Sequence, residues 1–337
     1  MVGAFMDLDA LLGPVAVQPP CGPNLEYDPE FQALEVAARG KDEQVIGDKR
    51  IPAVPPAWAE VRELAQRLFS RTKDLRVAIW WTRAAIALSG LVGLRDGIAL
   101  IHCLLASNWD GVHPQIDPAD KDPAFRMNVL AGLVDPATTL REIRHAVIAD
   151  VPRKGRVTVL DVLLATGKLQ PGGGESARTL AEVQALLQEA AYQPAGLEAA
   201  GQAHTLVTDL QKLLVEKVGS ERMPDFGPLR DLLAPAVELC RAALESTSRS
   251  TDDVTAGQEA GAAAVPAGAP VVIRTREDAI RMLDRVCEYM ERTEPASPAP
   301  LLIRRAQRLM NKSFVEIIED LTPDSVVAIK ALGGIKD

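Results

Sequence analysis

The sequence predicts an all-α protein made of several helical segments. Alanine and leucine, both strong helix formers, dominate the composition, whereas aromatic residues make up only 4% of it. Apolar residues recur at spacings of three and four, the period of a helix with one buried face. Stretches rich in proline, glycine and small polar residues separate these segments. With 337 residues, the chain is long enough for two or three domains.

Residues 1–170 are predicted to form an N-terminal helical domain. Turn-forming residues precede a first helix at about 30–39, and the helical period resumes at Trp58 after a loop. The next helix is predicted to end at Gly90, which suits a C-cap. Near the end of this domain, Val157–Val159 is either a short strand or the lead into a helix.

Residues 175–245 are predicted to form a middle helical domain, separated from the first by the glycine-rich stretch "QPGGGES". Three amphipathic helices are expected there, at about 175–192, 196–218 and 228–245. Residues 246–273 contain few bulky apolar side chains, so they are predicted to be a flexible linker. A small helical oligomerisation module is expected at residues 274–337.

Opposite charges distinguish two successive helices of this module. A helical wheel of residues 299–312 predicts one buried apolar face, made by Leu302, Ile303, Ala306, Leu309 and Met310. Arginines gather on the other face, and the helix that follows exposes acidic residues. Both charged faces could simply be solvated, because exposed ion pairs contribute only about 0 to 1 kcal/mol.

In a ring, however, the basic face of one subunit can meet the acidic face of the next. We therefore predict that the arginines steer a contact between subunits and that an exposed leucine supplies affinity. The residues of this predicted oligomer interface are Leu301, Arg304, Arg305, Arg308, Glu316 and Glu319.

Charge and cysteine usage narrow the class of protein. A formal net charge of −9 argues against a general nucleic-acid binder, which needs a basic stripe. The four cysteines are scattered without a C-x-x-C pair, as expected for free thiols in a reducing cytoplasm. The N-terminus lacks the pattern of a signal peptide, and we found no window of 18 uncharged apolar residues. These features predict a soluble cytoplasmic protein that does not insert into a membrane.

No catalytic, cofactor or metal site is predicted. The four histidines, at positions 102, 113, 145 and 204, do not have the spacing that places two metal ligands on one helical face. The Gly-Lys pair at residues 167–168 lacks the remaining residues of a phosphate-binding loop, and no G-x-S-x-G motif occurs. We therefore expect a protein that is not an enzyme.

Three aromatic or polar features are ambiguous in the sequence alone. Of the adjacent Trp80 and Trp81, one ring is expected to enter the core and the other to pack at a helix interface. The "RTKDLR" turn at residues 71–76 and Trp109 in "NWDGVHP" fit either a recognition site or a capped, hydrogen-bonded helix junction.

Several of these motifs together resemble a known family. The succession "LLGPVAVQPPCGPNLEYDPEF", "RTKDLRVAIWWTRAAIALSGLVGLRDGIALIHCLLASNWDGVHP" and "DKDPAFRMNVLAGL" resembles the ImpA N-terminal domain of TssA proteins, from bacterial type VI secretion systems. The resemblance covers about residues 8–170, and the segment "SPAPLLIRRAQRLMNKSFVEIIEDL" looks like the tail of the short TssA class.

The resemblance implies a non-enzymatic assembly factor that forms multimeric rings through its C-terminal region. It also implies partners among the cytoplasmic baseplate, sheath and inner tube proteins, at the baseplate near the inner membrane. An alternative is an adaptor that links the contractile sheath to an ATP-driven disassembly machine without forming a ring. The mass of the intact protein in solution separates the two, since only the first requires a large closed oligomer.

Overall fold

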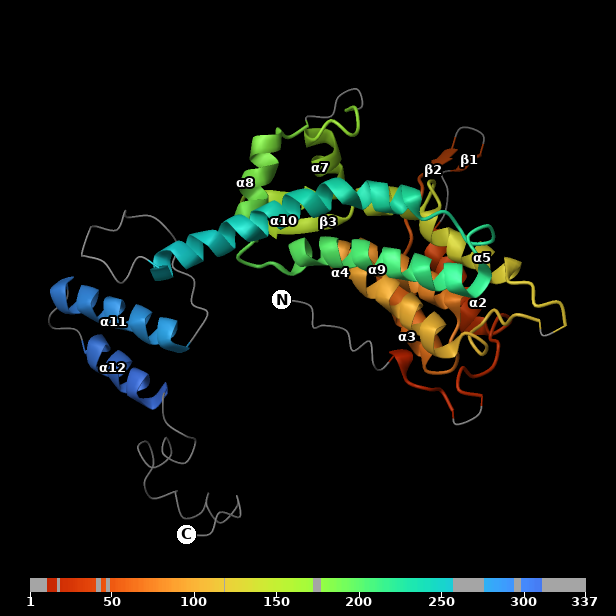
Figure 1. The fold of residues 1–337 in the computed structure, drawn as a ribbon, viewed down its shortest axis with the longest axis horizontal. Coiled ribbons are helices and arrows are strands. Elements are labelled where there is room, and N and C mark those ends of the chain that lie inside the picture. Colours follow the sequence, from red (N-terminus) through yellow and green to blue (C-terminus); the bar gives the residue numbers. More distant parts are fainter. Residues whose placement is uncertain are drawn as a thin grey trace, which may run out of the picture. The chain divides into compact units, whose positions relative to one another are not determined.

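The computed structural model of the chain describes residues 11–16, 19–40, 44–46, 49–117, 119–171, 177–256, 276–293 and 298–310. These residues are mostly helical, with two short antiparallel hairpins (Figure 1). The chain divides into two compact units, Met1–Ala260 and Gly261–Asp337. The predicted helical class therefore holds for most of the described chain, and the two hairpins are the exception.

The described helices of the first unit are α2 (Pro29–Arg39), α3 (Trp58–Phe69), α4 (Leu75–Asn108), α5 (Ala124–Ala131), α6 (Thr139–Arg144), α7 (Val159–Ala165), α8 (Leu180–Ala190), α9 (Ala195–Val218) and α10 (Gly227–Ala256). A 3-10 turn, η1 (Gly132–Val134), follows α5. The hairpins are formed by β1 (Gln44–Ile46) with β2 (Lys49–Ile51) and by β3 (Val147–Val151) with β4 (Gly155–Thr158). The second unit contains α11 (Arg276–Thr293) and α12 (Ala299–Met310).

Helix α4 is bent back on itself at the centre of the first unit. At Gly90 the backbone leaves the helical conformation, with φ of 60°, so the helix predicted to end there does end there. Small residues then let the two arms approach closely, since a Cβ atom on Gly93 would lie 2.0 Å from the carbonyl oxygen of Ala85. Strand β3 passes equally near the bend, because a Cβ on Gly90 would lie 2.0 Å from the Val147 carbonyl oxygen.

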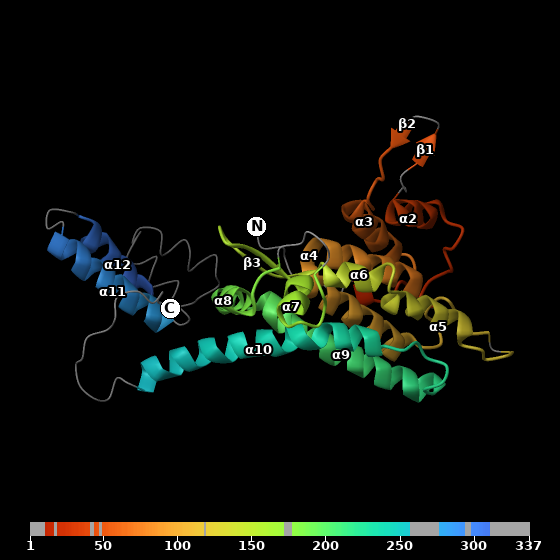
Figure 2. The same ribbon diagram turned by 90° about the horizontal axis from the view of Figure 1, so that it is seen from above.

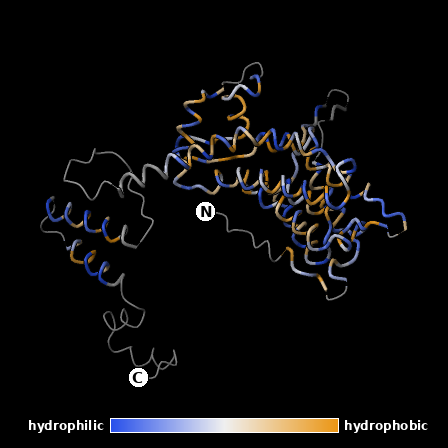
Figure 3. Tube along the Cα trace, in the orientation of Figure 1, coloured by the Kyte–Doolittle hydropathy of each residue, from blue (hydrophilic) through white to orange (hydrophobic). Residues whose placement is uncertain are grey.

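Of the described helices, α4 alone is long and apolar enough to cross a membrane by length and composition. Most of its apolar window, 61%, is buried inside the first unit, where α3 and α9 pack against it. Figure 3 shows apolar residues gathered where the helices of this unit meet. Helix α4 therefore serves as the central core helix of this unit.

The predicted boundary at residues 171–176 does not separate two compact bodies. Helix α9 packs along α4, and α10 lies beside α9 (Figure 2). A Cβ on Gly196 would lie 1.9 Å from the carbonyl oxygen of Ile148, so the start of α9 also touches β3. A glycine-rich stretch indicates a connection between helices. Whether it also separates two domains depends on whether the apolar faces of the helices before and after it pack together. The expected N-terminal and middle domains are thus one unit.

The structure also differs from the predicted boundary at the end of α10. Its predicted end at residue 245 is too early, because the helix continues through Ala256 and occupies the first part of the expected linker. Adding a residue to an existing helix is far easier than starting one, so polar residues of modest propensity extend it. The hydroxyls of Ser246 and Thr247 both donate to the carbonyl oxygen of Ala243, at 2.8 and 3.1 Å. The remainder of the expected linker lies outside the described residues.

Both alternatives for the segment near Val157 are realised in part. Strand β4 ends at Thr158, and α7 begins at Val159. Thr158 caps this helix by accepting from the Asp161 backbone N–H, while the Asp161 carboxylate accepts from the Thr158 N–H at 2.8 Å. The β1–β2 hairpin lies in a stretch that we expected to be a loop.

Candidate functional site

The helices α11 and α12 carry the residues of the predicted oligomer interface. They pack against each other through the fully buried Cys287, and through Gln307, whose side chain donates to the Ile280 carbonyl oxygen and the Asp284 carboxylate at 2.9 and 3.0 Å. Arg304 reaches back to α11 and pairs with Glu291 at 3.0 Å. This pair holds the pKa of Arg304 above its usual value, because the Glu291 carboxylate accepts its hydrogen bonds. Arg304 therefore joins the two helices within one chain.

The predicted apolar face of α12 coincides only in part with the face that packs on α11, since Ile303 is partly buried. Leu302 and Ala306 are exposed, Leu302 to 68%, whereas Pro300 and Gln307 are buried. A helical wheel identifies an apolar stripe but not the side of the helix that packs on α11. Gln307, a polar side chain with two hydrogen bonds, occupies that contact. The exposed Leu302 and Leu301, which is 73% exposed, together form an apolar patch at the start of the helix.

The other predicted interface residues have different outcomes. Arg305 and Arg308 are exposed on α12, as expected of a charged face. Glu316 and Glu319 lie outside the described residues, as do the side chains of Leu309 and Met310. The contact between basic and acidic faces of neighbouring subunits therefore stays a prediction.

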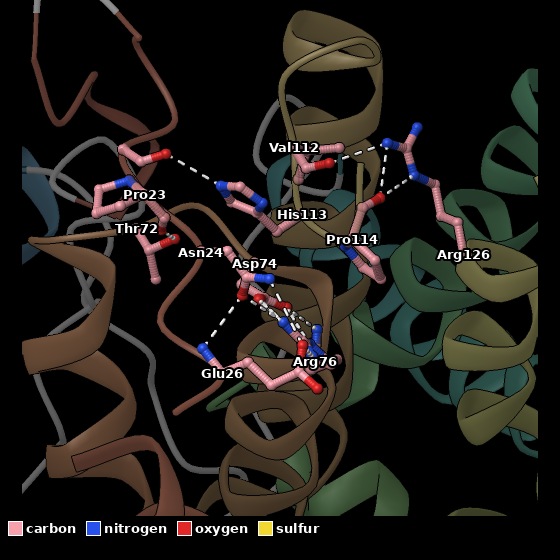
Figure 4. Close-up of polar contacts among 11 residues, drawn as sticks. Pro23, Asn24, Glu26, Thr72, Asp74, Arg76, Val112, His113, Pro114 and Arg126 are labelled. Atoms are coloured by element: carbon pink, nitrogen blue, oxygen red, sulfur yellow. Dashed lines mark hydrogen bonds and ion pairs between the residues drawn. The ribbon is translucent and has the colours of Figure 1, made fainter. Parts of the chain in front are cut away.

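A second candidate site lies in the first unit, where three loop segments meet around the start of α4 (Figure 4). We call it the polar hub. Backbone hydrogen bonds join the segments: the Lys73 N–H donates to the Cys21 carbonyl oxygen at 2.7 Å, and the His113 N–H donates to that of Lys73 at 2.9 Å. Side chains extend this pairing, since Thr72 donates to the Pro23 carbonyl oxygen at 2.7 Å, and a ring nitrogen of His113 lies 3.0 Å from the Gly22 carbonyl oxygen.

Asp74 organises one side of the polar hub. Its fully buried carboxylate caps α4 by accepting from the Arg76 backbone N–H at 2.8 Å. The Arg76 guanidinium pairs with the same carboxylate at 2.8 Å and reaches Asn24 at 2.9 Å and Glu26 at 3.0 Å. Hydrogen bonding to Arg76 lowers the pKa of Glu26. The "RTKDLR" turn is therefore a capped helix junction, one of the two alternatives.

Two buried cations hold the other side of the hub. Among the described residues, neither has a carboxylate partner within hydrogen-bond distance. Lys73 donates to the carbonyl oxygens of Leu11 and Phe69, at 2.6 and 2.9 Å, and burial lowers its pKa. Arg126 donates to the carbonyl oxygens of Trp109, Val112 and Pro114, at 2.7 to 3.0 Å. Burial lowers the pKa of Arg126 to about 10. These cations hold the surrounding backbone by donating hydrogen bonds to carbonyl oxygens rather than by forming ion pairs.

The sequence pointed to the turns of this hub but not to its buried cations. Arg126 sits in "DPAFRMNVL", where an arginine on a short helix reads as a solvated side chain. The one signal that could have predicted burial of Arg126 is its spacing from Met127 and Leu130, which lie on the same buried side of α5. Of the tryptophan pair, Trp81 is buried, and Trp80 is partly buried with the Arg83 guanidinium 4.8 Å from its ring, as predicted.

Nothing in the described part of the chain resembles a metal centre, and no group of three or more potential ligands occurs there. Among the histidines, His113 is buried in the hub, while His145 is exposed and the other two are partly buried. The hub can position a loop rigidly. Its thiol, Cys21, is buried, and burial raises the pKa of that thiol.

Comparisons with known proteins fit this geometry. The type VI secretion system component TssA1 of Pseudomonas aeruginosa is 40% identical over 350 residues, spanning 98% of this chain and 99% of that protein. The chain belongs to the TssA family. The family described as "ImpA, N-terminal, type VI secretion system" matches residues 12–135, which include Asp74, His113 and Arg126 of the polar hub.

A solved TssA structure has the same fold. It is the N-terminal domain, including the conserved ImpA_N region, of the TssA component of the type VI secretion system from Burkholderia cenocepacia. The TM-score is 0.55 at 25% identity, and the match covers 73% of this chain and 97% of that one. Residues 1–170 make up only about half of this chain, so the match extends beyond them. This is expected if α8–α10 belong to the same unit.

Proposed function

We propose that this TssA family member is a non-enzymatic assembly protein of a type VI secretion system. In this proposal it forms a multimeric ring through α11, α12 and the residues that follow them. The ring associates with the cytoplasmic baseplate near the inner membrane and coordinates assembly of the sheath and the inner tube. The unit Met1–Ala260 is the part that docks partner proteins.

The observation that carries the self-assembly is the apolar patch on α12. Leu301 and Leu302 are adjacent, and more than two thirds of each side chain is exposed. Burying two such leucines at an interface removes apolar surface from water, worth about 1.5 to 3 kcal/mol for each side chain fully buried. The arginines nearby, Arg305 and Arg308, would set the orientation of the contact rather than most of its affinity.

The proposal is tested by substituting the patch. The double variant Leu301→Glu and Leu302→Glu should lower the mass of the full-length protein to that of a monomer or a small oligomer, measured by light scattering. A matched control is Val36→Glu with Val54→Glu, since these valines are 68% and 52% exposed in the first unit. The control should keep the mass of the unaltered protein.

A patch variant that retains its full mass would remove Leu301 and Leu302 from the interface. An unaltered protein that is monomeric at micromolar concentration would instead favour the adaptor for an ATP-driven disassembly machine, which needs no ring. Circular dichroism of each variant shows whether α11 and α12 remain folded.

A further inference from the structure

A cavity of about 700 Å³ opens beside the polar hub. One wall is made by residues 109–117 and 121–123, and the other by the end of α9 with Arg222 in the turn that follows it. We call it the Trp109 cavity. It joins the "NWDGVHP" motif to a segment about a hundred residues later, so the sequence alone does not reveal it.

The hub holds the indole of Trp109 in place. Arg126, which is 1% exposed, donates to the Trp109 carbonyl oxygen at 2.7 Å, and its guanidinium lies 4.9 Å from the ring centre. Lys217 lies 5.5 Å from the centre of the same ring. The ring is therefore positioned before any partner arrives, which reduces the ordering that binding requires.

The charges that line the cavity favour an anionic partner. Lys121, Lys217 and Arg222 are exposed cations of the lining, and the described residues offer none of them an ion-pair partner. Two carboxylates also line it. Asp117 is engaged with the backbone N–H of Ala119 at 2.8 Å, and Asp110 interacts electrostatically with the buried Arg126. The cations outnumber the carboxylates on a chain whose net charge is −9.

We propose that the Trp109 cavity docks an acidic peptide segment of a partner protein, with an apolar side chain of that segment against the indole. Carboxylates of the segment would meet Lys121, Lys217 and Arg222. Asp110 and Asp117 can accept N–H groups of the peptide backbone, which a phosphate group does not offer. This inference rests on the proposed docking role of the first unit. It specifies where on that unit a partner binds and that the bound segment is acidic.

The test uses the full-length protein and a fluorescein-labelled acidic decapeptide of aspartate and glutamate around a central leucine and phenylalanine. Fluorescence anisotropy measures its affinity. The double variant Lys121→Glu and Arg222→Glu should bind at least tenfold more weakly than the unaltered protein. A matched control, Arg141→Glu with Lys168→Glu, makes the same change in net charge at exposed residues outside the cavity and should stay within twofold.

Two further measurements identify the occupant. Replacing the central leucine and phenylalanine of the peptide by glycine should weaken binding at least fivefold, because the indole then loses its apolar contact. Trp109→Ala should have a similar effect, and circular dichroism checks its fold.

The inference fails if the unaltered protein does not bind the acidic peptide, or if the cavity and control variants lose affinity equally. It also fails if micromolar ATP displaces the peptide, which would indicate a nucleotide site. Light scattering of the same variants separates this result from the assembly proposal. The cavity variant should have the same oligomer mass as the unaltered protein. If the unaltered protein is itself monomeric, that result contradicts the ring and leaves the peptide-binding result to decide the cavity proposal.

Discussion

Arg304 of α12 and Glu291 of α11 form an ion pair at 3.0 Å within one chain. Arg304 was one of three arginines expected to face a neighbouring subunit, and it has instead a described partner in its own subunit. Both side chains are about half exposed, so the pair guides the packing of two helices more than it stabilises them. This relationship changes how the charges of the interface should be tested.

We expect Arg304→Glu and Arg308→Glu to act differently. Arg304→Glu places a carboxylate beside Glu291 and should lower the thermal midpoint of the α11–α12 pair, as followed by circular dichroism. Arg308 is exposed without an ion pair among the described residues, so Arg308→Glu should leave that midpoint unchanged. Equal midpoints for the two variants would show that the Arg304–Glu291 pair has no structural role.

The bend of α4 predicts a strong effect of one methyl group. Gly90→Ala introduces a Cβ 2.0 Å from the Val147 carbonyl oxygen at a residue with φ of 60°. Backbone strain and overpacking should together lower the free energy of unfolding by about 3 kcal/mol or more. Gly201→Ala is the matched control, because it lies inside α9 with no atom within 4 Å of the added Cβ, and should raise stability by about 0.5 to 1 kcal/mol. Urea denaturation measures both, and similar effects at the two glycines would contradict the bend.

Removing the buried guanidinium of Arg126 should weaken the polar hub. Arg126→Met leaves the carbonyl oxygens of Trp109, Val112 and Pro114 without this donor, which should cost about 3 kcal/mol in the free energy of unfolding. Arg141→Met, at an exposed residue, should change it by less than about 0.5 kcal/mol. If the two variants unfold at the same urea concentration, the hub does not stabilise this unit.

Burial predicts which thiols react. Cys21, Cys240 and Cys287 are buried, and burial raises the pKa of the Cys240 thiol to about 12. Burial shields these three thiols, so a disulfide reagent at pH 8 should modify only the partly buried Cys103 in the folded protein, slowly because burial also raises the pKa of Cys103. All four should react in urea. Rapid modification of Cys240 in the folded protein, located by mass spectrometry, would contradict the packing of α10.

The extent of the first unit can be tested by truncation. Residues 1–170 alone lack α9, which packs along α4, and should therefore expose apolar core and aggregate. Residues 1–256 retain α8–α10 and should give a cooperative thermal transition. A soluble, cooperatively folding fragment 1–170 would restore the domain boundary that the sequence predicted.

Local signals predicted local structure well. The end of the first α4 arm at Gly90 and one inward ring in the Trp80–Trp81 pair follow from residues that are neighbours in sequence. A capped junction was one of the two alternatives for the "RTKDLR" turn. Contacts between distant segments could not be predicted this way. The sequence does not show that Gly196 touches β3, that Gln307 rather than Leu302 faces α11, or that Lys217 lies beside Trp109. Each depends on which of several apolar faces pair in the folded chain.

The most direct test of the proposed function is the mass of the intact full-length protein, measured by native mass spectrometry at micromolar concentration. The proposal predicts a single closed oligomer with a defined number of subunits, because a head-to-tail contact repeated around an axis closes into a ring. A protein that remains monomeric or dimeric at every concentration tested would contradict the ring and favour the adaptor.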